Sequence, residues 1–282
     1  MNGMLLIHKP AGMTSFDVIA KLRRKYRISK IGHTGTLDPD ATGLLLVLFG
    51  NSTKLVPFLD YKDKEYIAEY AIGYTSDTLD MAGNVEKCDV EMIPDVPAIK
   101  EALDKLTGNL VQVPPKYSAI RVKGKHLYEY ARKGEEIEIP KRNVTVFAHE
   151  YLSSNDDKVR VRIVCSSGTY IRSLAYDFGE LIRIPSIMAS LQRTRIGAFE
   201  LKNAYTLDTL PESVTDLKLL SPYEILSDYP YEECENPSDI ISGKPYVSER
   251  KEPLLIMTHK NTVLAAYEKT DRGVYICKRG LL

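Results

Sequence analysis

The chain has 282 residues, 44% hydrophobic and 27% charged, a balance typical of a globular protein with one large domain and one small one. Lys and Arg together number 38, as do Asp and Glu, so the formal net charge is zero. Neutrality argues against a polybasic or acidic tail and, as a whole-chain average, against a polyanionic partner.

The average conceals a segregation of charge along the chain. Three segments, 1–84, 109–150 and 151–201, together carry six more basic than acidic residues. Residues 240–282 carry four more basic than acidic residues, whereas residues 206–239 hold nine acidic residues and one basic residue. The sequence therefore indicates a mildly basic body, an acidic connector and a basic C-terminal piece, which leaves room for local contacts to nucleic acid.

Cysteine spacing and hydropathy indicate the compartment. The four cysteines form no C-x-x-C pair and have no histidine at zinc-ligand spacing, which predicts a reducing compartment and no metal site. The longest apolar run, Leu44 to Phe49, is far too short to span a bilayer, and no charged leader precedes a long apolar run at the N-terminus. We expect a cytoplasmic protein that does not associate with membranes.

The N-terminal residues predict a strand followed by a basic helix. A short strand spans residues 4–8, and Thr14 or Ser15 can cap a helix that continues to Tyr26. Most of a dense cation cluster lies on this helix, and it is either a solvated face or a phosphate-binding edge. Its members are Lys21, Arg23, Arg24, Lys25, Arg27 and Lys30.

Beyond this helix, the chain alternates between strands and helices and ends in short strands. Residues 32–43 predict a loop that leads into the apolar run. Alternating apolar and polar residues predict strands at 65–73, 144–147 and 159–165, and helical spacing predicts helices at 95–106 and 169–183. After the acidic connector, strands are predicted at 254–257, 262–267 and 274–277. The fold class is α+β with a small all-β tail.

Common cofactor signatures are missing from the sequence. It contains no G-x-G-x-x-G after a strand, no Walker loop, no H-E-x-x-H and no G-x-S-x-G, so we expect no cofactor and chemistry run by side chains alone. Functional residue types are densest in residues 32–43, around Asp38 and Pro39. Proline biases Asp38 towards an extended conformation and suits a first helical position, so Asp38 is either a helix N-cap or a functional carboxylate.

A second distinctive stretch interleaves cations with tyrosines. Residues 114–125 contain Tyr117 among four basic residues, and Tyr128 and Tyr130 follow. Looped RNA is bound by surfaces of this kind, because bases stack on rings and phosphates take the cations. Alternatively, the tyrosines are half-buried core residues.

These residues carry a resemblance to a known family. Residues 32–39, continuing through Ala41 and Gly43, resemble the catalytic motif of the tRNA pseudouridine synthase B (TruB) family. Further segments match the family's other motifs in the right order: 64–66, 73–80, 114–124, 168–174 and 191–194. The resemblance covers residues 3–197, and the tail is more weakly similar to the family's PUA-like RNA-binding domain.

The resemblance implies a pseudouridine synthase fold, with a mixed, largely antiparallel central sheet flanked by helices. It assigns residues 1–205 to the catalytic domain, within which 109–150 would contact RNA. Residues 206–239 would form the acidic connector, and residues 240–282 a small all-β PUA-like domain.

The implied reaction is the isomerisation of uridine 55 in the T loop of tRNA to pseudouridine, without a cofactor. By the resemblance, Asp38 is the nucleophile, Arg172 pairs with it, and Tyr66 stacks on the target base and is a candidate for proton transfer. The chemistry suits an aspartate, since a carboxyl group with an ordinary pKa of about 3.9 is already ionised at neutral pH.

Further positions match residues that line the family's substrate pocket: His33, Tyr170 and Leu191. The target uridine must be flipped out of its loop, and His33 could occupy the vacated stack. We expect phosphate contacts from Lys21 and Arg24 on the basic helix, and substrate contacts from Arg121 and Lys123. The chain departs from the family pattern at residues 184–187 and at Gln192, where arginine is usual.

Three other functions remain compatible with the sequence: a subunit of a guide-RNA complex, an RNA-binding or tRNA-folding module in which Asp38 is only a cap, and a base-excising hydrolase. The short C-terminal tail favours action alone. We therefore expect a monomer that binds the T stem-loop of tRNA without an obligate protein partner.

Overall fold

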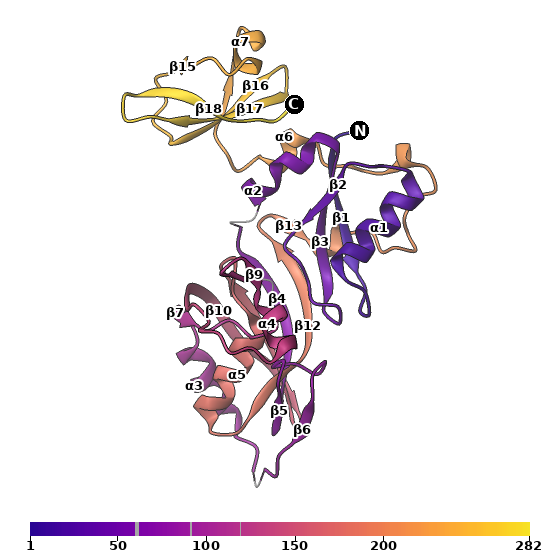
Figure 1. The fold of residues 1–282 in the computed structure, drawn as a ribbon, viewed down its shortest axis with the longest axis vertical. Helices are drawn as coiled ribbons and strands as arrows, with labels where there is room; N and C mark the ends of the chain where they lie inside the picture. The colour runs from indigo at the N-terminus through magenta and orange to yellow at the C-terminus, as the bar shows by residue number, and fades with distance from the viewer. Residues whose placement is uncertain (60–61, 91, 119) are drawn as a thin grey trace.

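The computed structural model describes residues 1–59, 62–90, 92–118 and 120–282. Figure 1 shows a long central sheet with helices along it and a smaller sheet at one end. Within the described residues the central sheet has nine strands, β2 (Ile31–Thr34) and β13 (Phe199–Glu200) lying off its main path. The order along that path is β1 (Gly3–Lys9), β3 (Thr42–Phe49), β12 (Ser186–Ile196), β4 (Lys64–Ile72), β11 (Lys158–Cys165), β10 (Arg142–Asn155) and β7 (Gly108–Gln112).

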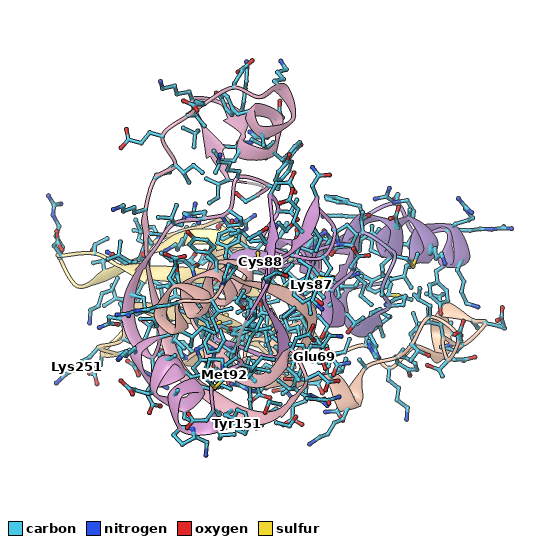
Figure 2. The ribbon with its side chains drawn as sticks, turned by 90° about the horizontal axis from the view of Figure 1, so that it is seen from below. Glu69, Lys87, Cys88, Met92, Tyr151 and Lys251 are labelled. Carbon is cyan, nitrogen blue, oxygen red and sulfur yellow. The ribbon has the colours of Figure 1, made fainter. Side chains whose placement is uncertain are left out.

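Helices cover the two halves of this sheet. On one half α1 (Ser15–Tyr26) buries Val18 and Leu22 against β1 and β3, and on the other α3 (Val96–Lys105) and α5 (Ile171–Ile182) pack over β4, β10 and β11. Figure 2, viewed from the end with the β5 (Tyr74–Ser76) and β6 (Val85–Lys87) hairpin, shows the side chains crowded around these elements. The remaining short elements are η1 (Gly50–Leu55), α2 (Val56–Leu59), β8 (Arg121–Val122), β9 (Lys125–His126), α4 (Leu127–Lys133), η2 (Leu201–Asn203) and η3 (Val214–Asp216).

The predicted mixed, largely antiparallel sheet is confirmed. Among the described pairings of this sheet, β3 and β12 are parallel and the others antiparallel. The parallel pair joins the two halves, with Arg193 opposite Gly43. Gly43 has φ 109°, and a Cβ there would lie 2.3 Å from the Arg193 carbonyl oxygen, so only glycine lets the two strands approach this closely.

Two local predictions around Asp38 need correction. The loop predicted from residue 32 starts later, because β2 continues to Thr34 and pairs antiparallel with β3. The interpretation of Asp38 as a helix N-cap is wrong, since residues 35–41 are irregular and the strand β3, not a helix, follows Pro39. Asp38 is therefore a loop residue, held by turn geometry: the Ala41 amide donates to the Asp38 carbonyl over 3.1 Å.

The C-terminal chain forms a separate five-stranded sheet within the described residues, which agrees with a small all-β domain. Its order is β14 (Tyr231–Glu233), β16 (Leu254–His259), β17 (Thr262–Lys269), β18 (Val274–Gly280) and β15 (Tyr246–Val247), and α6 (Pro222–Ile225) and α7 (Pro237–Ile241) lie beside it. The strand β14 and both helices start before residue 240, so part of the acidic segment 206–239 is built into this domain.

A shared apolar cluster connects the two sheets. Leu6 and Leu46 of the large sheet belong to the same buried cluster as Leu226, Ile256 and Ala266 of the C-terminal region. At the edge of this contact Lys62 forms an ion pair with Asp228, and the Tyr229 hydroxyl donates to the Phe58 carbonyl over 2.8 Å. In the part of the chain that the structure describes, no helix is long and apolar enough to cross a membrane.

Candidate active site

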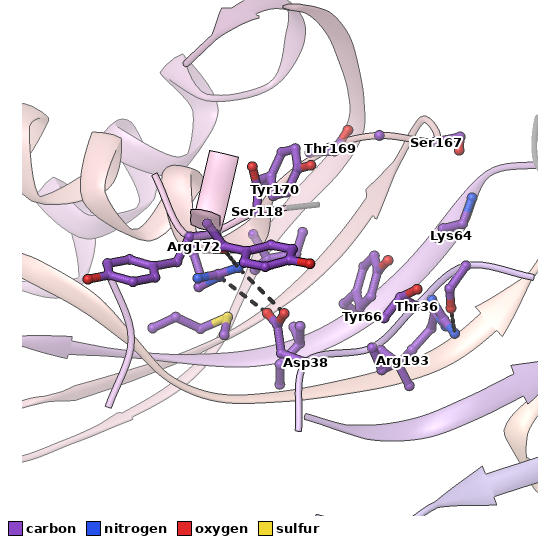
Figure 3. A pocket seen from close by; sticks show the side chains of 18 residues that line it. Thr36, Asp38, Lys64, Tyr66, Ser118, Ser167, Thr169, Tyr170, Arg172 and Arg193 are labelled. Atoms are coloured by element: carbon purple, nitrogen blue, oxygen red, sulfur yellow. Dashed lines mark hydrogen bonds and ion pairs between the residues drawn. The ribbon is translucent and has the colours of Figure 1, made fainter. Parts of the chain in front are cut away.

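A cavity of about 420 Å³ opens where the two halves of the sheet meet (Figure 3). Its walls come from the loop that follows β2, from β4 and β12, from the N-terminus of α5 and from residues 117–118. Five residues predicted from the sequence line it together: Asp38, Tyr66, Tyr170, Arg172 and Leu191. Segments far apart in the sequence therefore converge on one pocket.

The Asp38 loop is anchored on both sides. The Ser15 hydroxyl, in the first turn of α1, accepts a hydrogen bond from the Leu37 amide over 3.1 Å. On the other side, the buried Lys9 ammonium donates to the Pro39 carbonyl over 2.9 Å and to carbonyls of residues 10 and 13. Burial lowers the pKa of Lys9, while Asp40 and Asp38 oppose this shift. These bonds fix the backbone from which the Asp38 carboxylate projects.

Arg172 holds the Asp38 carboxylate with two nitrogens. Its Nε lies 3.2 Å from Asp38 Oδ2, and its Nη2 lies 3.5 Å from Asp38 Oδ1, a forked arrangement drawn as dashed lines in Figure 3. The Arg172 side chain is only 8% exposed, so this helix residue is buried in the pocket wall. Its orientation is fixed by Asp80, 3.4 Å away, and by donation to the carbonyls of Thr78 and Tyr117.

Enclosure governs the charge of Asp38. Burial raises the pKa of the Asp38 carboxyl and Asp80 raises it further, whereas Arg172 and Lys9 lower it. The side chain nevertheless keeps 42% of its surface accessible, on the side that faces the cavity. An ionised carboxylate in this position presents a nucleophilic oxygen to any group that enters the pocket.

Tyr66 forms a wall of the cavity from β4. Burial raises the pKa of its phenol to about 12, with the neighbouring Arg193 guanidinium opposing the shift. The hydroxyl is therefore protonated at neutral pH. Arg193 is itself 1% exposed and donates to the carbonyls of Gly35 and Leu44, each over 2.8 Å. It ties the Asp38 loop to β12 and supplies positive charge beside Tyr66.

Tyr170 sits at the N-cap of α5 and reaches the cavity through a fixed backbone. Its amide donates to Gln112 Oε1 over 2.8 Å, and Gln112 Nε2 donates to its carbonyl over 3.0 Å. Burial raises the pKa of Tyr170. The segment 114–124 contributes Tyr117 and Ser118 to the same wall, whereas its residue 119 lies outside the described residues.

Other candidate residues lie outside the cavity lining. His33 is on β2, with its ring edge-on to Phe16 at a centroid distance of 5.1 Å. Lys21 and Arg24 are exposed on α1, and Arg121 and Lys123 are exposed on the β8–β9 hairpin. None of these residues lines the cavity.

Two residues that contribute to the site were not singled out from the sequence. They are Asp80, which forms an ion pair with Arg172, and Arg193. Both fall inside segments that match the family, so the order of motifs was an available signal. Their spacing, however, gives no sign that the β5–β6 loop and β12 fold over the same pocket. Across the described residues, no group of three His, Cys, Asp or Glu is arranged to hold a metal ion.

Comparisons with known proteins agree with this geometry. Residues 23–171 match the family model described as TruB family pseudouridylate synthase (N terminal domain). The tRNA pseudouridine synthase B of Oceanobacillus iheyensis is 39% identical over 284 residues, 95% of this chain and 93% of the relative. The Bacillus licheniformis protein of the same name is 44% identical over 221 residues, 76% of this chain and 72% of its own.

Solved structures share the fold at low sequence identity. A chain of a Cbf5–Nop10–Gar1 complex superposes with a TM-score of 0.74 at 20% identity, over 99% of this chain and 85% of its own length. A chain of an H/ACA RNP bound to a substrate RNA gives the same TM-score at 19% identity, with the same coverage. The family match over more than half of the chain and the relatives at about 40% identity lead to one conclusion: this chain belongs to the TruB family of pseudouridylate synthases.

Proposed function

We propose that this protein isomerises uridine 55 in the T loop of tRNA to pseudouridine, with Asp38 as the nucleophile. The observation that carries the proposal is the Asp38–Arg172 pair at the base of a cavity walled by tyrosines. Support for tRNA as the substrate comes from relatives along nearly the whole chain that are named tRNA pseudouridine synthase B.

The reaction is balanced without an external reactant. The N1–C1′ bond of the uridine breaks, the uracil turns within the cavity, and a C5–C1′ bond forms. C5 loses a proton and N1 gains one, so the product is an isomer of the substrate. Asp38 needs no base to activate it, and Arg172 holds its carboxylate in one orientation throughout.

Tyr66 and Leu191 would enclose the flipped base, and Tyr170 would close the opposite wall. The Tyr66 phenol, with its pKa raised to about 12, is neutral in the free protein. Acceptance of the C5 proton by Tyr66 would require the phenolate, which the adjacent Arg193 guanidinium is placed to stabilise.

The rest of the molecule would bind the remainder of the T stem-loop. His33 would fill the gap left by the flipped base, and Lys21, Arg24, Arg121 and Lys123 would contact the substrate around the pocket. In this proposal residues 1–205 are catalytic, residues 109–150 contact RNA, residues 206–239 are the connector, and residues 240–282 form a PUA-like RNA-binding domain. The protein would work as a cytoplasmic monomer without a guide RNA or obligate partner.

The test uses a T stem-loop transcript labelled with tritium at C5 of its uridines. We expect the wild-type protein to release tritium while the RNA mass stays unchanged, and Asp38→Asn to release none although it still binds the RNA. Free uracil among the products would indicate a base-excising hydrolase instead. Binding without tritium release by the wild type would indicate an RNA-binding module, and either result would overturn the proposal.

A further inference from the structure

Phe16 is an exposed aromatic ring at the start of α1. It is 70% exposed, the highest value among the six phenylalanines, whereas Val18, Ile19 and Leu22 of the same helix are buried. A single exposed apolar residue is ordinary on a protein surface. Phe16 nevertheless has an unusual position, because its neighbour Ser15 is hydrogen-bonded to the loop that carries Asp38.

Two contacts place Phe16 next to the proposed active site. Its neighbour Ser15 is hydrogen-bonded to the amide of Leu37, and Leu37 precedes Asp38. The Phe16 ring itself meets the His33 ring edge-on, with an interplanar angle of 77° and a centroid distance of 5.1 Å. This contact leaves Phe16 70% exposed, so its ring keeps surface on which another aromatic group can stack.

Helical geometry aligns Phe16 with two arginines. Ala20 and Arg23 follow it at four and seven positions, which brings them onto the same side of the helix, and Arg27 follows as the C-cap. All four are exposed, and Ala20 leaves the space between ring and cations open. Lys25 pairs with Glu212, but within the described residues neither Arg23 nor Arg27 has an ion-pair partner.

We propose that this stripe, Phe16 with Arg23 and Arg27, binds the T-loop strand beside the flipped uridine, and that Phe16 stacks on one of its unpaired bases. This inference rests on the proposed function. At about 1.5 Å per residue the stripe extends about 16 Å, enough for two or three nucleotides. One ring followed by two cations matches a base followed by its phosphates.

Binding is tested in the Asp38→Asn background, so that no turnover occurs, with a fluorescent T stem-loop. We expect Phe16→Ala and Phe16→Leu to raise Kd about tenfold, within the range known for base–aromatic stacking, and Phe16→Trp to stay within about twofold of the parent. Arg23→Gln with Arg27→Gln should reduce the slope of log K against log salt by about two, while Phe16→Ala leaves the slope unchanged.

The matched control is Met92→Ala. Met92 is 78% exposed, and Figure 2 shows it on a different part of the molecule from α1, so its removal should leave Kd unchanged. T-loop variants with one abasic position each then identify the stacked base: its removal should weaken binding to the parent but not to Phe16→Ala.

The proposal fails if Phe16→Ala and Phe16→Leu bind like the parent, if Phe16→Leu alone retains full affinity, or if no abasic position is coupled to Phe16. It also fails if the wild type sediments as a dimer that Phe16→Ala dissociates, since the ring would then be a subunit contact. Tritium release by the wild type distinguishes these outcomes from failure of the proposed function.

Discussion

At the scale of single residues, the neighbours of Asp38 determine whether its carboxyl group is ionised. Enclosure and Asp80 raise the pKa of the Asp38 carboxyl, and Arg172 is the first of the two cations that oppose them. Because only the carboxylate is a nucleophile, activity should fall as the pH drops through this pKa. In the proposed reaction, Arg172 would therefore set both the orientation of Asp38 and the acid limit of activity.

Removal of Arg172 should move that acid limit. In Arg172→Met the guanidinium no longer opposes burial and Asp80, which raise the pKa of the Asp38 carboxyl. The acid limb of the kcat/KM profile should therefore shift to higher pH, and activity at pH 7 should fall at least about hundredfold. Arg172→Lys keeps a charge without the fork and should give a smaller shift. An acid limb that stays in place in both folded variants would contradict this role.

A second buried polar pair, His149 and Tyr70, lies outside the cavity lining and makes the stability of the fold depend on pH. His149 is buried, its Nε2 lies 3.1 Å from the Tyr70 hydroxyl, and burial lowers its pKa to about 4. The stabilisation that His149 contributes to the fold is present above the pKa of an unfolded histidine, about 6.5, and is lost as the pH falls through its folded pKa of about 4.

Asp177 has the opposite pH dependence. Its pKa is raised to about 6 in the fold, so the stabilisation that it contributes is present below the ordinary aspartate pKa of 3.8 and is lost as the pH rises through 6.

His149→Leu isolates the first contribution, since Asp177 is common to both proteins. Between pH 6 and pH 4.5 the wild type should lose stability relative to the variant by up to about 1.4 kcal/mol per pH unit. Urea unfolding at several pH values measures this difference. Parallel stability curves for the two proteins would show that His149 is not held neutral in the fold.

The motif around residues 32–39 and its companions predicted which residues react, and that assignment stays a prediction, but the motifs gave no geometry for these residues. Spacing alone left a helix cap open for Asp38, and that interpretation was wrong because a strand follows Pro39. A distance of 3.2 Å between residues 134 positions apart depends on how β5, β12 and α5 pack, which local propensity does not encode.

At the scale of elements, amphipathic order made most of the fold predictable. The helix from Ser15, the helix capped by Asp95 and the strands on either side of residues 260–261 all follow from period and capping residues. β12 was not predicted, because register shifts at 188–190 and 193–195 interrupt its alternation. It is nonetheless the strand that joins the two halves of the sheet.

The junction of β3 and β12 should tolerate no side chain at Gly43. Gly43→Ala combines a strained φ of 109° with a Cβ 2.3 Å from the Arg193 carbonyl oxygen, and moving Arg193 would disturb the Gly35 and Tyr66 contacts. We expect a loss of at least about 3 kcal/mol in the free energy of unfolding.

Gly273→Ala is the matched control for that substitution. Gly273 also has a positive φ, 78°, but a Cβ there meets nothing within 4 Å. It should cost about 1 kcal/mol, the backbone strain alone. If chemical denaturation gave the same loss in the free energy of unfolding for both variants, the close contact at the strand junction would add no cost of its own, which would contradict the prediction.

At the scale of the whole molecule, the fold shows where the segregated charges of the sequence lie. The acidic residues 206–239 cancel the basic body in the net charge, yet part of this segment is structural: Asp228 pairs with Lys62, and Glu232 with Arg250. Sequence counts located the segment but could not show that it carries β14 and α6 into the C-terminal domain. Chain-wide neutrality is therefore compatible with a basic working surface.

The two sheets should unfold together, because one apolar cluster joins Leu6 and Leu46 to Leu226 and Ile256. Leu226→Ala removes a fully buried side chain from this cluster and should cost about 2–5 kcal/mol, lowering a single calorimetric transition for the whole chain. Ile240→Ala, in the cluster internal to the C-terminal sheet, is the control for that sheet alone. Two separate transitions, with Leu226→Ala shifting only the smaller one, would contradict this prediction. They would mean that the C-terminal sheet unfolds independently of the large sheet, and that the shared apolar cluster does not couple the two.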